Sequence, residues 1–361
     1  MAPFEWQQRK DRSGRHFLPD QRPGRRLAVP DPFQARRQLM KIACRRTLVA
    51  FLLTAATAAH AQGWPERPIR MIVPFGPGSA TDTMARIVTE PLSKALGQPI
   101  VLENKPGANS TLGTNIAAKA DPDGYTLALA TNSGLAASPA GLTEGVPYDP
   151  VKDLKYVTLV GSISYVWVAN NDVPVQTAKE MVDYIKAHPG KLNYASGNTG
   201  GISYGGFIKN SYGLDITHVA YKSTPPALVQ LIGGDVQVMM ADVASATPMI
   251  KGGKVKALGV PVAKRNPLLP EVSTFEEQGL STPPDMSGWW AVVAPAATPD
   301  AILDKLNTEL VRVLNMPDIQ AKLLNNGIVA IPSSRAEATQ YQREQLEVWR
   351  RMVSELHLQG S

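Results

Sequence analysis

The sequence predicts an α/β fold with more than one structural unit. Short apolar, β-branched runs alternate with longer segments of helical periodicity, which is typical of a parallel or mixed sheet flanked by helices. The chain has 361 residues, of which 43% are hydrophobic. That is enough for one large core, or for two cores of roughly 100 to 150 residues each. We therefore expect a globular α/β protein of two domains.

Strands are expected at the apolar runs, and helices at the periodic segments between them. The strand candidates are IRMIVPF, PIVLEN, YTLALAT, LKYVTLVG and YVWVANN. The helix candidates are 80–96, 110–119, 177–188, 203–212, 224–233, 300–315 and 335–353. In open α/β sheets, ligands bind beyond the carboxyl ends of strands. The loops that follow strands are therefore the first places to search for a site.

Residues 40–61 have the layout of a secretory signal. Lys41, Arg45 and Arg46 precede an apolar run, and small residues surround the expected cleavage point after Ala61. The run of about 13 apolar residues is shorter than the roughly 20 that a membrane span needs. We expect an exported, periplasmic chain with the signal removed. The arginine pair leaves both the Sec and the twin-arginine route open.

Most of the positive charge precedes the expected mature chain. Residues 1–61 hold 12 Lys and Arg and 4 Asp and Glu; taken from totals of 37 and 31, these leave 25 basic and 27 acidic residues. The mature chain therefore lacks the basic surface typical of nucleic-acid binding. Residues 1–39 are rich in Arg and Pro without apolar periodicity, which indicates a disordered leader or a start codon assigned too far upstream.

Cysteine and metal chemistry are excluded from the mature chain. Cys44 is the only cysteine and lies within the signal, and no cluster of His, Asp and Glu has metal-ligand spacing. We expect no metal and no cofactor. For nucleophilic catalysis, His218 is the histidine placed to act as base for Ser196 or Ser203. A histidine in an apolar strand is more often structural, and no Gly-x-Ser-x-Gly motif is present. A periplasmic serine hydrolase is kept as the alternative function.

The first candidate binding loop is PFGPGSATD, residues 74–82. Gly76 and Gly78 allow backbone conformations closed to other residues, and Asp82, with Ser79 nearby, can cap the helix that follows. A helix N-terminus with free N–H groups attracts an anion. The third glycine of a dinucleotide motif and the lysine of a phosphate-binding loop are both absent, which favours a carboxylate over a phosphate. A capped turn without a ligand is the alternative.

Two further loops also follow predicted strands. Thr131-Asn132-Ser133 offers small hydrogen-bonding side chains suited to a carboxylate oxygen, although a helix cap is the commoner use of such residues. The loop SGNTGGISYGG, 196–206, is polar and glycine-rich and opens a helix. Because it lies in a different half of the chain from the first loop, the two together predict a ligand held from two sides. The pair Trp289-Trp290 fits either a cleft lining or a packed core.

In these motifs the chain resembles the periplasmic solute-binding proteins of tripartite tricarboxylate transporters, also called Bug proteins. The resemblance runs from about Trp64 to Trp349 and includes WPERPIRMIVPFGPGSATD, LGQPIVLENKPGANSTLGT, DPDGYTLALA, THVAYKSTPPALVQLIGGDVQVM and APAATPDAILDKLN. It implies a two-lobed, type II-like periplasmic binding fold, with two mixed sheets flanked by helices and a double-crossover hinge. Lobe one would hold 62–163 plus 288–361, and lobe two 164–287.

The resemblance also implies a function and a site. Such a receptor is not an enzyme; it captures a small organic carboxylate between its lobes and delivers it to the large and small membrane subunits of the transporter. We expect a monomer that binds no nucleic acid, and a ligand-presenting sensor on the same fold is a further alternative. The expected ligand-binding residues are Phe75, Gly76, Gly78, Ser79, Ala80, Thr81, Asp82, Thr131, Asn132, Ser133, Ser196, Gly197, Asn198, Thr199, Gly200, Ser203, Tyr204, Tyr221 and Asp242.

The chain departs from the usual pattern of this family at three places. The first loop has Gly76 and Ser79 where the family commonly has proline and glycine. The second loop has Tyr204 and Gly205 in place of a histidine and a leucine, and Ser223 replaces a glycine. We expect these changes to reshape the pocket, so the ligand of one family member cannot be assigned to this chain directly.

Overall fold

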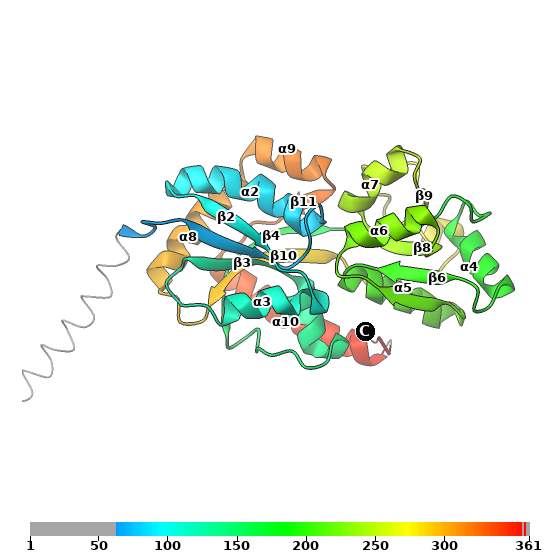
Figure 1. Ribbon diagram of the computed structural model, residues 1–361, viewed down its shortest axis with the longest axis horizontal. Helices are drawn as coiled ribbons and strands as arrows, with labels where there is room; N and C mark the ends of the chain where they lie inside the picture. The colour runs from blue at the N-terminus through cyan, green and yellow to red at the C-terminus, as the bar shows by residue number, and fades with distance from the viewer. Residues whose placement is uncertain (1–62, 356, 359–361) are drawn as a thin grey trace, which may run out of the picture. The chain divides into compact units, whose positions relative to one another are not determined.

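The computed structural model describes residues 63–355, 357 and 358, which form two mixed sheets with helices on their faces (Figure 1). The leader, the signal peptide and the cleavage point predicted after Ala61 lie outside the described residues. Among the residues that are described, no helix is long and apolar enough to cross a membrane.

The first sheet has six strands in the order β11-β4-β10-β3-β1-β2. Strand β1 runs parallel to β2 and β3, whereas β10 runs antiparallel to β3 and β4. The strands are β1 (Ile69–Val73), β2 (Ile100–Asn104), β3 (Thr126–Thr131), β4 (Leu154–Ile163), β10 (Gly288–Pro295) and β11 (Ile328–Ala330).

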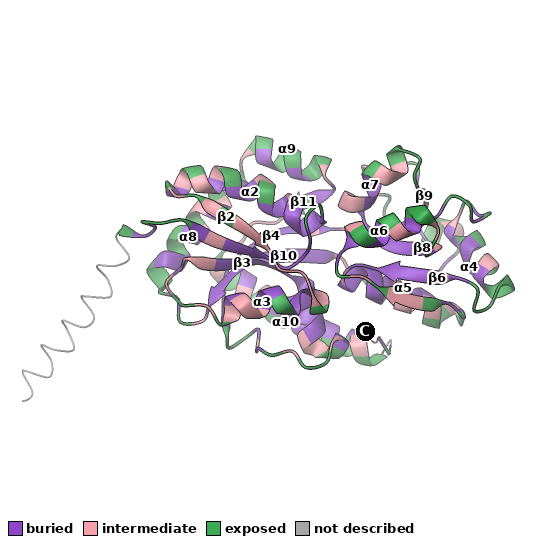
Figure 2. Ribbon diagram, viewed as in Figure 1, coloured by how far each residue is buried: buried purple, intermediate pink, exposed green. Residues whose placement is uncertain are grey.

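Helices cover both faces of this sheet and bury its apolar side chains. One face packs against α2 (Ala80–Leu96), α8 (Asp300–Leu314) and α9 (Pro317–Asn325). The other face packs against α3 (Thr111–Ala118), η2 (Ser133–Leu142) and α10 (Arg335–Glu355). Figure 2 shows the buried strands between helices whose outer surfaces are exposed. A short helical turn, η1 (Ala108–Ser110), precedes α3.

The second sheet has five strands in the order β7-β6-β8-β5-β9. They are β5 (Tyr165–Ala169), β6 (Asn193–Ser196), β7 (Thr217–Ala220), β8 (Val238–Asp242) and β9 (Lys256–Gly259). Strand β6 is parallel to β7 and β8, and β5 is antiparallel to β8 and β9. The accompanying helices are α4 (Ala178–Ala187), α5 (Thr199–Tyr212), α6 (Thr224–Gly233), α7 (Val243–Lys251) and the short η3 (Glu276–Gln278).

The chain passes from one sheet to the other twice. Only Ser164 separates β4 of the first sheet from β5 of the second, and the return lies between β9 and β10. Two mixed sheets flanked by helices confirm the predicted fold class. The lobe boundaries stay a prediction.

Helix periodicity located the regular helices and missed the irregular ones. Helices α2 and α6 span the residues predicted for them, while α5 begins at Thr199, four residues before the predicted start. Apart from the three-residue turns η1 and η3, three helices of the described chain were not predicted, namely η2, α7 and α9. Pro139 and Pro248 lie inside η2 and α7, where proline usually breaks a helical pattern. Pro317 is the first residue of α9, a position that favours proline, and does not explain why that helix was missed.

Candidate functional site

A small cavity lies where the ends of the two sheets meet, and residues from both sheets line it. Its free volume is about 30 Å³, the space of two or three water molecules on the same measure. The lining residues are Phe75, Ser79, Ala80, Thr81, Thr131, Asn132, Ser133, Ile163, Tyr165, Asn198, Thr224, Asp242, Gly288, Trp289 and Trp290. No lysine, arginine or histidine is among them.

Four α-helices begin at this cavity, and so does η2, which starts at Ser133. Ser79 caps α2, Asn198 caps α5 and Asp242 caps α7, and each cap side chain accepts a hydrogen bond from a backbone N–H of its helix. Thr224 is the first residue of α6. A helix N-terminus carries a partial positive charge and free N–H groups. These helix N-termini therefore favour an anion, although no cationic side chain lines the cavity and Asp242 places a carboxylate in its lining.

Three of these residues hold one another in place. Asp242 Oδ2 accepts hydrogen bonds from Thr224 Oγ1 at 2.7 Å and from Asn198 Nδ2 at 3.2 Å. The other carboxylate oxygen of Asp242 accepts from the backbone N–H of Ser245 at 2.9 Å. Asn198 also donates to Thr224 Oγ1, at 3.0 Å. This network fixes the starts of α5, α6 and α7 relative to one another.

A family model described as "Tripartite tricarboxylate transporter family receptor" matches residues 84–358. The chain belongs to this family. It is 35% identical over 317 residues to a UPF0065 protein of Bordetella pertussis, covering 87% of this chain and 97% of that protein. These matches confirm the resemblance found in the sequence.

Two solved structures show the same fold. The periplasmic binding protein BugD is 30% identical, with a TM-score of 0.77, over 82% of this chain and 100% of that one. MatC from Rhodopseudomonas palustris with bound malate is 32% identical, with a TM-score of 0.75, over 80% and 100% of the two chains. The chain is thus a substrate-binding receptor of the tripartite tricarboxylate transporter family.

In the first predicted loop, some residues line the receptor's cavity and others hold the loop in place. Ser79 lines the cavity, and its hydroxyl accepts from the N–H of Asp82 at 3.2 Å. Asp82 itself lies behind the loop. Burial raises the pKa of Asp82, but hydrogen bonds from Arg86, the Gly78 N–H and Asn104 outweigh it and keep the pKa below its usual range. Asp82 therefore braces the loop.

Glycines of the predicted loops lie at close contacts. A Cβ on Gly76 would be 3.0 Å from Ser223 Oγ, and one on Gly197 would be 2.4 Å from the backbone nitrogen of Thr224. A Cβ on Gly200 would lie 2.0 Å from Cζ of Tyr165. Packing therefore explains the glycines of the predicted loop 196–206 without a ligand.

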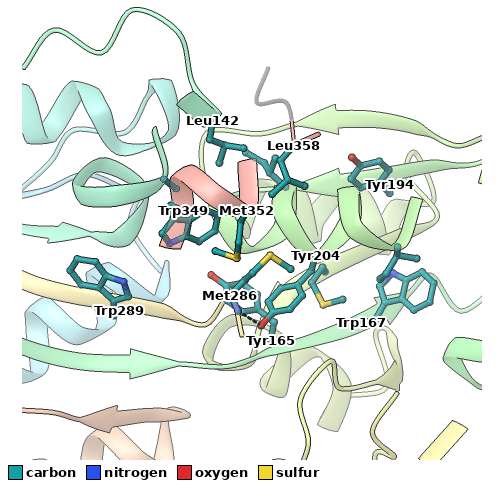
Figure 3. Packing of buried hydrophobic residues seen from close by; sticks show 14 of the residues in the cluster. Leu142, Tyr165, Trp167, Tyr194, Tyr204, Met286, Trp289, Trp349, Met352 and Leu358 are labelled. Carbon is teal, nitrogen blue, oxygen red and sulfur yellow. Dashed lines mark hydrogen bonds between the residues drawn. The ribbon is translucent and has the colours of Figure 1, made fainter. Parts of the chain in front are cut away.

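The polar residues at the start of α5 also lie in packed surroundings. The ring of Tyr204 is 5.4 Å from that of Tyr165, and its hydroxyl accepts from the Met286 N–H at 3.0 Å (Figure 3). Ser203 is buried, and its hydroxyl has no partner among the described residues. In total, ten predicted residues lie outside the lining: Gly76, Gly78, Asp82, Ser196, Gly197, Thr199, Gly200, Ser203, Tyr204 and Tyr221.

Nine predicted residues do line the cavity, together with six that were not predicted as ligand-binding. The nine are Phe75, Ser79, Ala80, Thr81, Thr131, Asn132, Ser133, Asn198 and Asp242, and the six are Ile163, Tyr165, Thr224, Gly288, Trp289 and Trp290. Thr224 opens a helix after strand β7, so the search of loops that follow strands could have included it. Ile163, Tyr165 and Gly288 lie where the chain crosses between sheets, and no residue pattern marks those positions.

The serine and histidine of the hydrolase alternative are hydrogen-bonded to each other away from the cavity. Ser196 Oγ is 2.7 Å from His218 Nε2, and the His218 ring stacks on Tyr194 at 4.6 Å. Burial, and secondarily the charge of Lys209, lowers the pKa of His218. Ser196 is buried, and in the described part of the chain no acidic side chain hydrogen-bonds the ring. This pair is therefore explained by packing and gives no support to a hydrolase.

Proposed function

We propose that this receptor captures a small organic carboxylate in the cavity between its two sheets, in the periplasm, and delivers it to the membrane subunits of a tripartite tricarboxylate transporter. The observation that carries the proposal is the meeting of four helix N-termini at a cavity that no cationic side chain lines. Such termini bind anions through backbone N–H groups. The malate bound to the related MatC supports a carboxylate as the anion.

In this proposal the receptor opens and closes around its ligand. Lobe one comprises 62–163 plus 288–361 and lobe two 164–287, and the two crossings between the sheets form the hinge. A cavity of about 30 Å³ is too small for an organic acid, so the lobes part to admit one. A ligand that contacts both lobes stabilises the closed state by its difference in affinity for the two states.

Hydrogen bonds to backbone N–H groups can supply the affinity that the proposal needs. Micromolar binding corresponds to about 8 kcal/mol. Each hydrogen bond to a charged group contributes roughly 1.5–3 kcal/mol, so a few of them provide a large share. The chain acts as a monomer without catalysis, after removal of the signal at Ala61. The ligand-binding residues are the nine predicted residues that line the cavity, together with Tyr165 and Thr224.

Calorimetric titration of the mature chain tests the proposal. The panel comprises malate, succinate, adipate, butyrate, hexanoate, benzoate and glutamate, each beside its neutral amide, together with the acid fraction of a periplasmic extract. We expect at least one acid to bind with micromolar affinity and to raise the melting temperature, while its amide does neither. Absence of binding across the panel and the extract would remove the receptor proposal for carboxylates.

A further inference from the structure

Two residues that line the cavity carry buried N–H groups without a partner. Among the described residues, the unpartnered buried atoms include Asn132 Nδ2 and Trp289 Nε1. Asn132 is 3% exposed and Trp289 is 2% exposed, and both line the cavity. A buried donor without a partner is destabilising, because it has lost its hydrogen bonds to water and gained none in the protein. A ligand that accepts these hydrogen bonds would remove that cost.

The two residues lie side by side at the cavity end of the first sheet, Trp289 in β10 and Asn132 directly after the last residue of β3. The antiparallel register of β10 and β3 pairs Trp290 with Thr131. The next residue toward the cavity on each strand is Trp289 and Asn132, respectively. Gly288 is close to both Tyr165 and Asn132. A Cβ on Gly288 would be 3.2 Å from Tyr165 Oη and 3.9 Å from Asn132 Oδ1. Asn132 and Trp289 therefore lie close together on one wall of the cavity.

The next residue, Trp290, also lines the cavity, but its indole N–H has a hydrogen-bond acceptor in the protein. Trp290 Nε1 donates to Thr81 Oγ1 at 2.9 Å. Trp289 instead packs edge-on against Tyr341, with ring centroids 5.2 Å apart and an interplanar angle of 81°. The indole of Trp289 is thus held by packing, while its N–H is left without a protein acceptor.

We propose that Asn132 and Trp289 determine ligand specificity by donating hydrogen bonds to a second acceptor oxygen of the ligand. The first carboxylate lies at the helix N-termini, so this inference rests on the proposed function. The second oxygen belongs to a second carboxylate, a carbonyl or an amide of the same molecule. Asn132 presents its amide nitrogen to this oxygen in the bound state, and an amide flip exchanges its two ends without moving the chain.

The variant Trp289→Phe tests this assignment, because it removes the N–H and keeps a ring against Tyr341. The matched control is Trp64→Phe. Trp64 is 3% exposed, its Nε1 is also buried and unpartnered, and it does not line the cavity. Asn132→Ala is the second test variant. Each protein is titrated with matched acids that differ in one acceptor group: succinate and butyrate, malate and 3-hydroxybutyrate, adipate and hexanoate.

We expect wild type to bind at least one diacid at least tenfold more tightly than its matched monoacid. Trp289→Phe and Asn132→Ala should each weaken that diacid about tenfold or more, as expected for a hydrogen bond to a charged group, and change the monoacid less than twofold. Trp64→Phe should change neither. Melting curves of all three variants should show folded protein.

The outcomes separate this inference from the proposed function. If wild type binds none of these six acids, the inference is overturned, whereas the proposed function is overturned only if the full panel and the periplasmic extract also give no binding. If wild type binds a diacid and both test variants bind it unchanged, only the inference is overturned. Equal binding of a diacid and its monoacid by wild type also overturns the inference, because no second oxygen is then recognised. If Trp289→Phe does not fold, Asn132→Ala decides the result.

Discussion

The side-chain amide of Asn109 donates a hydrogen bond to the hydroxyl of Thr199 over 2.8 Å. Asn109 belongs to η1, beside the first sheet, and Thr199 is the first residue of α5, beside the second sheet. Asn109 is also the middle of three consecutive non-glycine residues in the left-handed region, with φ of 44° at Ala108, 46° at Asn109 and 77° at Ser110. A strained turn thus holds an amide against the start of α5, within the predicted loop 196–206.

Substitutions at Asn109 should separate backbone strain from the hydrogen bond. Asn109→Ala loses the bond and places a residue that disfavours left-handed φ, whereas Asn109→Gly loses the bond but adopts that φ without cost. We expect Asn109→Ala to lower the free energy of unfolding by about 1 kcal/mol more than Asn109→Gly does, because a left-handed φ costs an L-residue roughly 1–2 kcal/mol and glycine offsets part of that difference by its backbone entropy. Urea denaturation measures both values. Thr199→Val removes the same bond without a backbone effect and serves as the control. Equal losses for the two Asn109 variants would show that the φ at this position is unstrained.

Gly200 is expected to be intolerant of any side chain because the ring of Tyr165 occupies the space. A Cβ there would lie 2.0 Å from Cζ of Tyr165, and overpacking of this kind typically costs 1–3 kcal/mol. We expect Gly200→Ala to lower the free energy of unfolding by about 2–3 kcal/mol, and to weaken ligand binding because Tyr165 lines the cavity.

The matched control for this substitution lies in the same helix. Gly206→Ala places a Cβ 3.2 Å from the flexible end of Leu358. Alanine is favoured over glycine within a helix by about 1 kcal/mol, so this variant should be neutral or stabilising. Comparable destabilisation by both substitutions would indicate that α5 tolerates no change, independent of Tyr165.

The position of the site could be predicted from the sequence, but the role of each residue in it could not. The search of loops after strands found Ser79, Asn132 and Asn198, because a cap residue at a helix start has a recognisable composition. The glycines of these loops do not show from the sequence whether they serve a ligand or close packing. Gly200 would look identical in the sequence whether its amide met a ligand or, as the structure shows, its missing side chain made room for Tyr165.

The search of loops after strands does not find the cavity residues that lie where the chain crosses between the sheets. Tyr165 begins β5 of the second sheet, one residue after β4 ends, and Gly288 begins β10 on the return to the first sheet. They meet because the tertiary fold brings the two crossings together, and a Cβ on Gly288 would be 3.2 Å from Tyr165 Oη. The predicted fold class needed only strand and helix patterning, whereas this contact depends on two segments separated by more than one hundred residues.

His218 should make the stability of the receptor depend on pH. Burial is the main cause that lowers its pKa, so the unfolded chain binds a proton at this residue more readily than the folded chain does. Its contribution is therefore constant above the unfolded pKa of about 6.5 and is lost as pH falls below that value. The free energy of unfolding of wild type should fall more steeply from pH 7.5 to pH 5 than that of His218→Gln.

The same variant distinguishes a receptor from the hydrolase. His218→Gln removes the proton acceptor that would serve Ser196 but leaves the cavity unchanged, so we expect the ligand-induced rise in melting temperature to persist. Parallel stability curves for wild type and variant would contradict the pH prediction. If wild type had esterase activity and the variant lost it, that result would support the hydrolase alternative.

The double variant Gly76→Pro with Ser79→Gly should change which acid binds while leaving the fold intact. Ser79→Gly removes the hydroxyl that accepts from the Asp82 N–H at 3.2 Å, and replacing a serine cap by glycine costs only a few tenths of a kcal/mol. Proline at position 76 adds atoms toward Ser223 Oγ, which a Cβ would approach to 3.0 Å. The wall of the cavity near the start of α2 therefore changes in shape and loses a hydroxyl.

Adding Ser223→Gly relieves the contact at position 76 and tests whether the effect comes from that approach. If the triple variant regains the wild-type ligand preference, the contact between Gly76 and Ser223 sets it. If the triple variant keeps the preference of the double variant, the Ser79 hydroxyl sets the ligand preference, because Ser79 lines the cavity. Calorimetry against the same acid panel measures the preference, and far-UV circular dichroism checks the fold. An unchanged preference and affinity in the double variant would mean that this loop is a turn and a helix cap without a role in ligand choice.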